Sequence, residues 1–230
     1  MSQAELDFVE ELYRLDAVSV DDRVGLVLDA LDRSDRRSDT IVVFTSDHGE
    51  GFGEHLKWMH SGDRLYEEFI RIPLILSGPG IPRGERVESP VSHVDLVPTL
   101  CQLLSLQCPQ DLPGRSLVEM FGTASIAPGP ERDRFVVSRN HRVLIRNGHK
   151  LIVRPHGVEL FDLRSDPAER RNLAAERPEV VFELQAAIDS LDAADDARRD
   201  RVRALLEDDV SLESVRKETL EELRAIGYVE

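Results

Sequence analysis

Apolar residues recur at helical spacing in the first part of the chain and then give way to a short continuous run. Between Leu15 and Leu31 they are three or four residues apart, which predicts an amphipathic helix that lies on a sheet: Val20, Val24, Val27, Leu28 and Leu31. After a polar connection, Ile41–Phe44 predicts a strand buried on both faces of a parallel sheet. Helix, loop and strand together predict half of a doubly wound α/β unit.

The pattern continues with a second strand and a second helix. The apolar segment Pro73–Ser77 predicts another buried strand, and the Gly- and Pro-rich stretch Gly78–Gly84 predicts a loop. Ser92 is suited to cap a helix whose apolar positions are Val94, Leu96, Val97, Leu100, Leu103 and Leu104. Asp95, three residues after Ser92, favours the same helix start.

A stretch of small residues and prolines, Gly122–Arg132, predicts a domain boundary. Beyond it the segments FVVS, RVLIR, KLIVR and VELFDL predict four short strands, with turns at Asn147-Gly148 and His156-Gly157. Short strands joined by tight turns indicate an antiparallel meander.

The end of the chain is predicted to be helical and charged. Pro178–Leu191 predicts a helix with proline in its first turn, Asp192–Arg201 a solvated charge run, and Leu205–Ile226 a closing helix that ends at Gly227. The predicted domains are therefore residues 1–128, a small antiparallel-sheet and helix subdomain at 129–191, and a charged helical tail at 192–230.

Composition excludes several classes of function. The 29 basic and 44 acidic residues give a net charge of −15, which argues against general binding to nucleic acid or to an anionic membrane. No run of eighteen apolar residues is present, and the first residues lack the layout of a signal peptide, so the chain as written is expected in the cytoplasm. Cys101 and Cys108 have no metal-site spacing and are interpreted as incidental thiols.

The candidate chemistry follows the first predicted strand. Asp47 and His48 come directly after it, and ligands bind at the carboxyl ends of strands in open α/β sheets. Glycines at 49, 51 and 53 keep the next loop free of bulk, while the polar groups around them suit a metal or anion site: Glu50, Glu54, His55 and His60. Taken alone, the Asp-His pair is also compatible with a turn closed by an Asx hydrogen bond.

These segments carry a family resemblance. DHGEGFGEH, then His60, then LYEEFIRIPLIL resembles the second half of a sulfatase of the alkaline-phosphatase superfamily, and HVDLVPTLCQLLSL, LPGRSL, GHKLI and ELFDLRSDPAERRNLA extend the similarity almost to the end of the chain. The resemblance implies part of a doubly wound, mostly parallel alkaline-phosphatase-like sheet, followed by a small α+β subdomain with an antiparallel sheet. It also implies a hydrolase of sulfate esters.

The same resemblance implies roles for particular residues. Asp47 and His48 correspond to ligands of one divalent cation, expected to be calcium, with magnesium or manganese as alternatives. His60 lies nearest the position that contacts the sulfate group; because the segment from His60 to Tyr66 is slightly long for the family, His55 and Lys57 are the alternatives. The alternative without a function is that His60 is a solvent-exposed loop histidine. Glu67 and Glu68 are interpreted as structural, as charges at a helix start or partners of Arg71.

The family's nucleophile signature, C/S-x-P-x-R, and its early Asp-Asp metal pair do not occur in the sequence. Cys108 precedes Pro109 but no suitably placed arginine follows, so no nucleophile is assigned. The expectation is therefore a C-terminal portion of a sulfatase that is inactive alone, binds metal weakly, and associates with an N-terminal half or with itself through an open strand edge. The alternatives are a phosphodiesterase or phosphonate hydrolase of the same superfamily, and a non-catalytic sulfatase-like association module.

Overall fold

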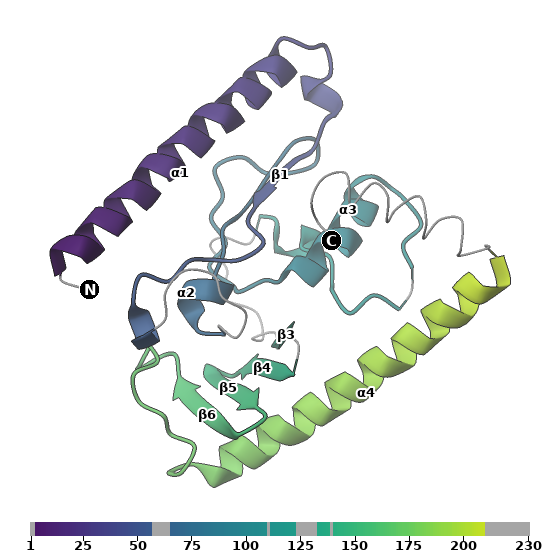
Figure 1. The fold of residues 1–230 in the computed structure, drawn as a ribbon. Helices are drawn as coiled ribbons and strands as arrows, with labels where there is room; N and C mark the ends of the chain where they lie inside the picture. Colours follow the sequence, from purple (N-terminus) through teal and green to yellow (C-terminus); the bar gives the residue numbers. More distant parts are fainter. Residues whose placement is uncertain (1–2, 57–64, 110, 123–132, 139, 210–230) are drawn as a thin grey trace. The chain divides into compact units, whose positions relative to one another are not determined.

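The structure is a computed structural model that describes residues 3–56, 65–109, 111–122, 133–138 and 140–209. The chain forms two compact units, Met1–Leu184 and Gln185–Glu230. The elements in chain order (Figure 1) are α1 (Gln3–Asp32), β1 (Val42–Thr45), α2 (Glu67–Ile70), β2 (Leu74–Ser77), α3 (Leu96–Leu103), β3 (Arg134–Ser138), β4 (His141–Arg146), β5 (His149–Arg154), β6 (Gly157–Asp162) and α4 (Pro178–Asp209). Short 3-10 turns lie at Arg37–Asp39, Glu54–Leu56, His93–Asp95 and Val118–Met120.

The first sheet corrects the prediction of buried parallel strands. β1 and β2 pair antiparallel, with Val42 opposite Ser77 and Thr45 opposite Leu74. Neither strand is buried on both faces, because Phe44 is 38% and Ile75 is 59% exposed. A short apolar run predicts a strand but does not encode the direction or the cover of its neighbours. The predicted burial on both faces was therefore wrong, and no parallel pair occurs among the strands that the structure describes.

The second sheet confirms the predicted meander. Its four strands follow one another in the order β3-β4-β5-β6, each antiparallel to the next. Asn147 and Gly148 form the two-residue turn between β4 and β5, and both have the positive φ that this kind of hairpin requires. The turn between β5 and β6 is Pro155-His156, one residue earlier than predicted.

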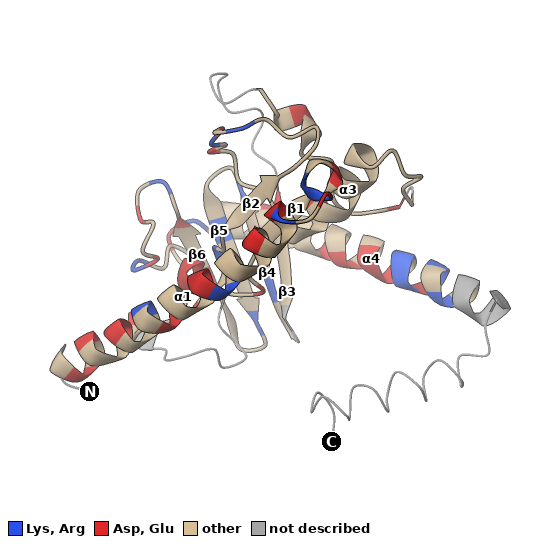
Figure 2. Ribbon diagram, turned by 90° about the horizontal axis from the view of Figure 1, so that it is seen from above, with Lys and Arg blue, Asp and Glu red and all other residues tan. Residues whose placement is uncertain are grey.

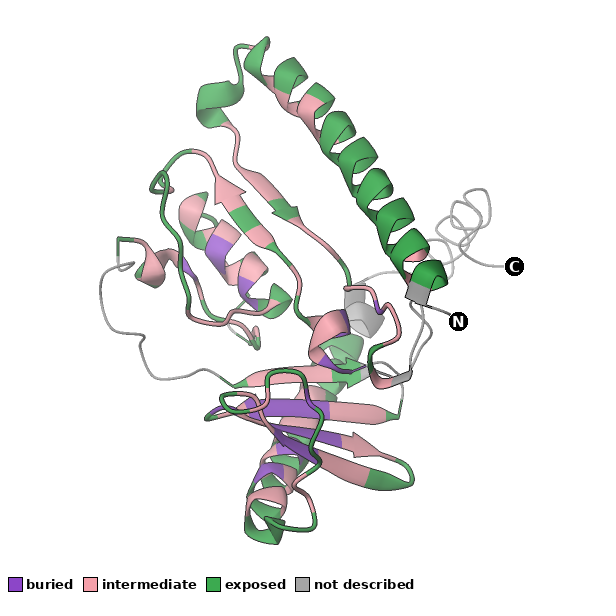
Figure 3. Ribbon diagram, turned by 90° about the vertical axis from the view of Figure 1, so that its left-hand side faces the viewer, coloured by how far each residue is buried: buried purple, intermediate pink, exposed green. Residues whose placement is uncertain are grey.

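The main core lies between this sheet and α2. Leu65, Tyr66 and Phe69 pack with Val143, Ile145, Ile152 and Phe161 of the sheet, and all seven are buried. Alternation along β4 places Val143 and Ile145 on this face and Leu144, also fully buried, on the other. Figure 3 shows the buried residues concentrated in β4 and β5. The segment that follows the candidate site is therefore anchored on the best-packed part of the unit.

The helices are longer than the sequence patterns predicted. α1 begins at Gln3, and its apolar residues are largely exposed, including Phe8 at 63% and Val27 at 69% (Figure 3). α4 runs through the predicted charge run as one continuous helix. Acidic residues are distributed along both helices (Figure 2), in keeping with the net charge of −15. The predicted closing helix at 205–226 lies largely outside the described residues.

The helix start predicted at Ser92 is confirmed. The carboxylate of Asp95 accepts the backbone N–H of Ser92 at 3.0 Å and that of Arg115 at 2.8 Å. Asp95 is buried, so these bonds replace the water that it loses on folding. Asp95 thereby fixes the entry to α3 and attaches the 115–118 segment to it.

Candidate functional site

Asp47 and His48 lie just beyond the end of β1. The hydroxyl of Ser46 donates to the carbonyl of His48 at 2.7 Å, and a carboxylate oxygen of Asp47 accepts the backbone N–H of His48 at 3.0 Å. These bonds fix the bend at Asp47, but the carboxylate bonds the adjacent residue and not the residue two positions on, so this is not the Asx turn considered from the sequence. The side chains of Asp47 and His48 are 86% and 48% exposed, respectively. The turn thus presents a carboxylate and an imidazole to solvent at the carboxyl end of a strand.

The side chains of Asp47 and His48 point toward each other, and the hydrogen bonds of His48 show which of its ring nitrogens carries the proton. Nδ1 of His48 lies 2.8 Å from the carbonyl oxygen of Gly49, so that nitrogen carries the proton and donates it. Nε2 is left as the atom that can ligate, and it faces Oδ2 of Asp47 at 3.6 Å. A histidine whose other ring nitrogen donates to a carbonyl is oriented in the way that metal-binding histidines are. The hydrogen bond from the His48 backbone is the main cause that holds the pKa of Asp47 below its usual value, so this oxygen donor is ionised.

Thr45 brings a third polar group to the end of the strand. Its hydroxyl donates to the carbonyl of Pro73 at 2.8 Å, and its oxygen lies 2.9 Å from Nε2 of His93. Since the hydroxyl proton is used toward Pro73, the ring N–H of His93 is the donor in this contact. The structure thus places His93, the first residue of the 3-10 turn that precedes α3, beside the end of β1.

The loop after His48 lies directly against α2. The backbone N–H of Gly49 donates to the carbonyl of Phe69 at 2.8 Å. A Cβ at Gly49 would stand 2.1 Å from the carbonyl oxygen of Glu68, and one at Gly51 would stand 2.4 Å from the Phe69 ring. Both distances are impossible for a side-chain carbon, so this close approach requires glycine at 49 and at 51.

His55 ends the loop in a constrained position. Its backbone has φ 51°, and its ring stacks on Tyr66 with centroids 3.7 Å apart. Nδ1 lies 2.9 Å from a carboxylate oxygen of Glu68, and Nε2 lies 3.0 Å from the carbonyl of Glu169. Burial lowers the pKa of His55, but the bonds to Glu68 and Glu169 and their charges outweigh it and raise the pKa above its usual value. Both ring nitrogens are therefore engaged by the protein.

Comparison with known proteins decides the family. The Sulfatase family model matches residues 12–106. An uncharacterised sulfatase, YidJ of Escherichia coli, is 35% identical over 164 residues, which are 67% of this chain and 32% of that protein. Arylsulfatase K of Mus musculus is 31% identical over 205 residues, which are 83% of this chain and 37% of that protein. The chain belongs to the sulfatase family.

Solved structures agree with this assignment at the level of the fold and sequence. A 2-O GAG sulfatase superposes with a TM-score of 0.62 and 29% identity, covering 79% of this chain and 42% of the other. The phosphonate monoester hydrolase of Agrobacterium radiobacter superposes with a TM-score of 0.60 and 27% identity, covering 76% of this chain and 39% of the other. The chain spans about a third to two fifths of the length of these sulfatase-family relatives.

Members of the sulfatase family generally use a divalent metal, and Asp47 and His48 fit part of such a site. A carboxylate oxygen and an imidazole nitrogen are both donors that divalent ions accept. Within the described ranges, no group of three or more His, Cys, Asp and Glu side chains is arranged to hold a metal ion. The pair therefore supplies two ligands, whereas calcium takes about six to eight.

The three residues considered for sulfate contact have different outcomes. His60 and Lys57 lie outside the described residues. His55 is only 16% exposed in its side chain and holds the loop to Glu68, Tyr66 and Glu169. The two glutamates of the LYEE segment have structural partners: Glu68 pairs with His55, and Glu67 lies 3.1 Å from the ammonium of Lys150.

Lys150 and Glu169 form a buried cluster that the sequence analysis missed. Lys150 is fully buried and lies 2.8 Å from a carboxylate oxygen of Glu169, whose other oxygen accepts the backbone N–H of Glu67 at 2.6 Å. Burial raises the pKa of Glu169, although the charge of Lys150 opposes the shift. The signal was present in the pattern of β5, where Lys150 takes an inward position and a buried lysine requires a carboxylate partner.

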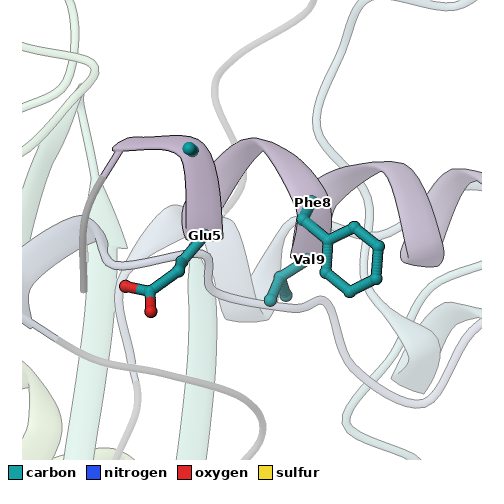
Figure 4. Close-up of a pocket in the computed structure, with 4 residues that line it drawn as sticks. Glu5, Phe8 and Val9 are labelled. Atoms are coloured by element: carbon teal, nitrogen blue, oxygen red, sulfur yellow. The ribbon is translucent and has the colours of Figure 1, made fainter.

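Other surface features add nothing to this site. Figure 4 shows a hollow lined by Ala4, Glu5, Phe8 and Val9, all on the first turns of α1, and it offers a single carboxylate. Among the helices that the structure describes, none combines the length and the apolar character needed to cross a membrane.

Proposed function

We propose that this chain supplies Asp47 and His48 as two ligands of the divalent-cation site in an enzyme that hydrolyses sulfate esters. The observation that carries the proposal is the convergence of His48 Nε2 and Asp47 Oδ2 at 3.6 Å, on an exposed turn at the end of β1, in a chain of the sulfatase family. The proposed cation is calcium, as the resemblance to sulfatases implies. Magnesium and manganese remain alternatives, because a donor set of one oxygen and one nitrogen does not select among these ions.

Each residue has a proposed part in the reaction. A bound cation would stabilise the negative charge that develops on the ester oxygens. Asp47 stays ionised because its pKa is lowered, and His48 keeps Nε2 available by donating its Nδ1 proton to Gly49. His60 is proposed to contact the sulfate and to protonate the leaving oxygen.

The nucleophile is proposed to lie in polypeptide outside these 230 residues. The sequence contains no C/S-x-P-x-R segment, and two ligands make a weak site. We therefore expect no turnover from these residues alone. The complete ligand shell would form when the rest of a sulfatase is present, either on the same polypeptide or as a second chain.

The proposed partner surface is the sheet that carries the site. Phe44 on β1 and Ile75 on β2 are exposed apolar residues on a sheet that has two strands among the residues the structure describes. Exposed apolar strands with open edges pair readily with other polypeptides. We propose that the N-terminal region of a sulfatase covers them, and that the chain associates with itself when this region is absent.

A second candidate is hydrolysis of phosphonate or phosphate esters. It is favoured by the likeness to the phosphonate monoester hydrolase of Agrobacterium radiobacter, at a TM-score of 0.60 and 27% identity. The same two ligands would serve, because sulfate and phosphonate esters both develop negative charge on their oxygens during hydrolysis.

Reconstitution tests the proposal. The N-terminal region of a sulfatase such as YidJ is co-expressed with this chain, and turnover of an aryl sulfate and of an aryl phosphonate is measured with and without divalent metal. We expect no turnover from the chain alone and metal-dependent sulfatase turnover from the pair, lost in Asp47→Ala and His48→Ala. Preferred phosphonate turnover would support the second candidate. Metal-dependent turnover by the chain alone would contradict the proposed incompleteness.

A further inference from the structure

The loop that carries the two candidate ligands is attached to the rest of the unit at both of its ends. Near its start, Gly49 donates its N–H to the carbonyl of Phe69 at 2.8 Å. At its far end, His55 reaches Glu68 through Nδ1 and Glu169 through Nε2. Between these points Gly51 lies against the ring of Phe69. The loop is therefore held along the length of α2.

The far attachment joins three separate parts of the chain through one side chain. The ring of His55 stacks on Tyr66, pairs with Glu68 at the start of α2, and contacts the backbone of Glu169 in the segment after β6. Glu169 is itself fixed, because it is 2% exposed, has φ 52°, and holds both Lys150 and the backbone of Glu67. His55 is thus attached to a buried residue that is paired with Lys150 of β5 in the four-stranded sheet.

We propose that His55 is a positioning residue that holds the ligand-bearing loop on α2 and the four-stranded sheet, and that it does not contact the sulfate. Three observations support this assignment. Both ring nitrogens bond to the protein, one ring face is covered by Tyr66, and only 16% of the side chain is exposed. A side chain that contacts a sulfate oxygen needs a donor directed toward the substrate, and both donors of His55 are already engaged.

The assignment also explains the backbone at this position. A non-glycine residue with φ 51° is uncommon, and the cost is tolerated where surrounding contacts fix the residue. The ring contacts of His55 are such a set. The inference rests on the proposed role of Asp47 and His48, since holding their loop matters for function only if they bind metal.

The test uses the full chain labelled with ¹⁵N and the substitution His55→Asn. Asparagine tolerates positive φ, so the substitution is compatible with the backbone at this position. It removes the ring that stacks on Tyr66 and bonds to Glu68 and Glu169. His156→Asn, in the exposed turn between β5 and β6, is the matched control. Two quantities are measured: amide exchange at Gly49 and Leu151, and the broadening of the Asp47 and His48 resonances by Mn²⁺.

We expect His55→Asn to speed exchange at Gly49 by about tenfold or more while leaving Leu151 in β5 unchanged. We also expect it to weaken the Mn²⁺ response several-fold. Unchanged exchange at Gly49 would overturn the inference, and so would an equal loss of protection at Leu151, because that result would mean a general structural role. If Mn²⁺ broadens the wild-type resonances no more than those of Asp47→Asn, the proposed metal-binding role of Asp47 and His48 is contradicted. The amide exchange of Gly49 would still test whether His55 holds the loop.

Discussion

The two sheets of the first unit differ in how deeply their apolar side chains are buried. In the four-stranded sheet Val143, Leu144 and Ile152 are fully buried, whereas in the two-stranded sheet Phe44 and Ile75 are 38% and 59% exposed. The candidate ligands follow β1, a strand of the poorly covered two-stranded sheet. The difference indicates that the described residues stabilise the region that supports the site more than the site strand itself.

The buried ion cluster should show the largest effect. Lys150→Met removes the ammonium group that faces both Glu67 and Glu169 and leaves two carboxylates partly or fully buried. We expect the free energy of unfolding to fall by about 3–5 kcal/mol. Urea denaturation measures it, with Arg86→Met as control, since the pair of Arg86 with Glu88 is exposed and contributes about 0–1 kcal/mol. A loss under about 1 kcal/mol for Lys150→Met would mean that the cluster is dispensable.

Matched apolar truncations should separate the two sheets. Leu144→Ala creates a cavity at a fully buried position and should cost about 2–5 kcal/mol of unfolding free energy. Ile75→Ala, at a position 59% exposed, should change it by about 0.5 kcal/mol or less. The comparison uses urea midpoints of both variants under one buffer condition. Equal losses would show that the two-stranded sheet is as well packed as the other.

The His55 contacts should make stability depend on pH. Burial lowers the pKa of His55, but Glu68 from α2 and Glu169, both in contact with the ring, outweigh it and raise the pKa. A raised pKa means that the stabilisation is fully present below the unfolded value of 6.5 and is lost as pH rises through the higher folded value. The difference in Tm between the wild type and His55→Asn should therefore shrink as the pH rises above 6.5. A difference that stays constant from pH 5 to about 9 would show that the charge of His55 contributes nothing.

Divalent metal should have the smallest effect. At a metal concentration equal to Kd, binding adds about 0.4 kcal/mol to the unfolding free energy, which corresponds to roughly 1–2 °C in Tm for a chain of this size. Thermal melts with added calcium, magnesium or manganese measure the shift, and His48→Ala should abolish it. A shift above about 10 °C at sub-millimolar metal would mean that further ligands complete the site.

Sequence patterns predicted the four-stranded sheet well because its information is local. Alternating apolar positions and the Asn147-Gly148 turn specify both the strands and their antiparallel pairing. The pairing of β1 with β2 was not predictable in the same way, since the two strands are separated by a long connection and their apolar runs carry no direction. The turn after β1 was found because a carboxylate and a histidine directly follow a strand.

The contacts of His55 show what the sequence could not supply. Its partners Glu68 and Glu169 are 13 and 114 residues away, so no spacing rule connects them. The resemblance to sulfatases placed His55 among the alternatives for sulfate contact without indicating which atoms of its ring were engaged. The need of Lys150 for a carboxylate partner could have been predicted, because a lysine at an inward strand position requires one. The sequence could not identify that partner as Glu169.

Amide exchange across β1 tests most directly whether the site strand depends on polypeptide beyond these residues. The amides of Val42–Thr45 are compared with those of Leu144 and Leu151, first in the chain alone and then with a sulfatase N-terminal region, while sedimentation reports its association state. We expect rapid exchange in β1 and slow exchange in the four-stranded sheet, with β1 becoming protected when the partner region binds. Strong protection of Val42–Thr45 in a monomeric chain alone would contradict the account, because the site strand would already belong to a closed fold.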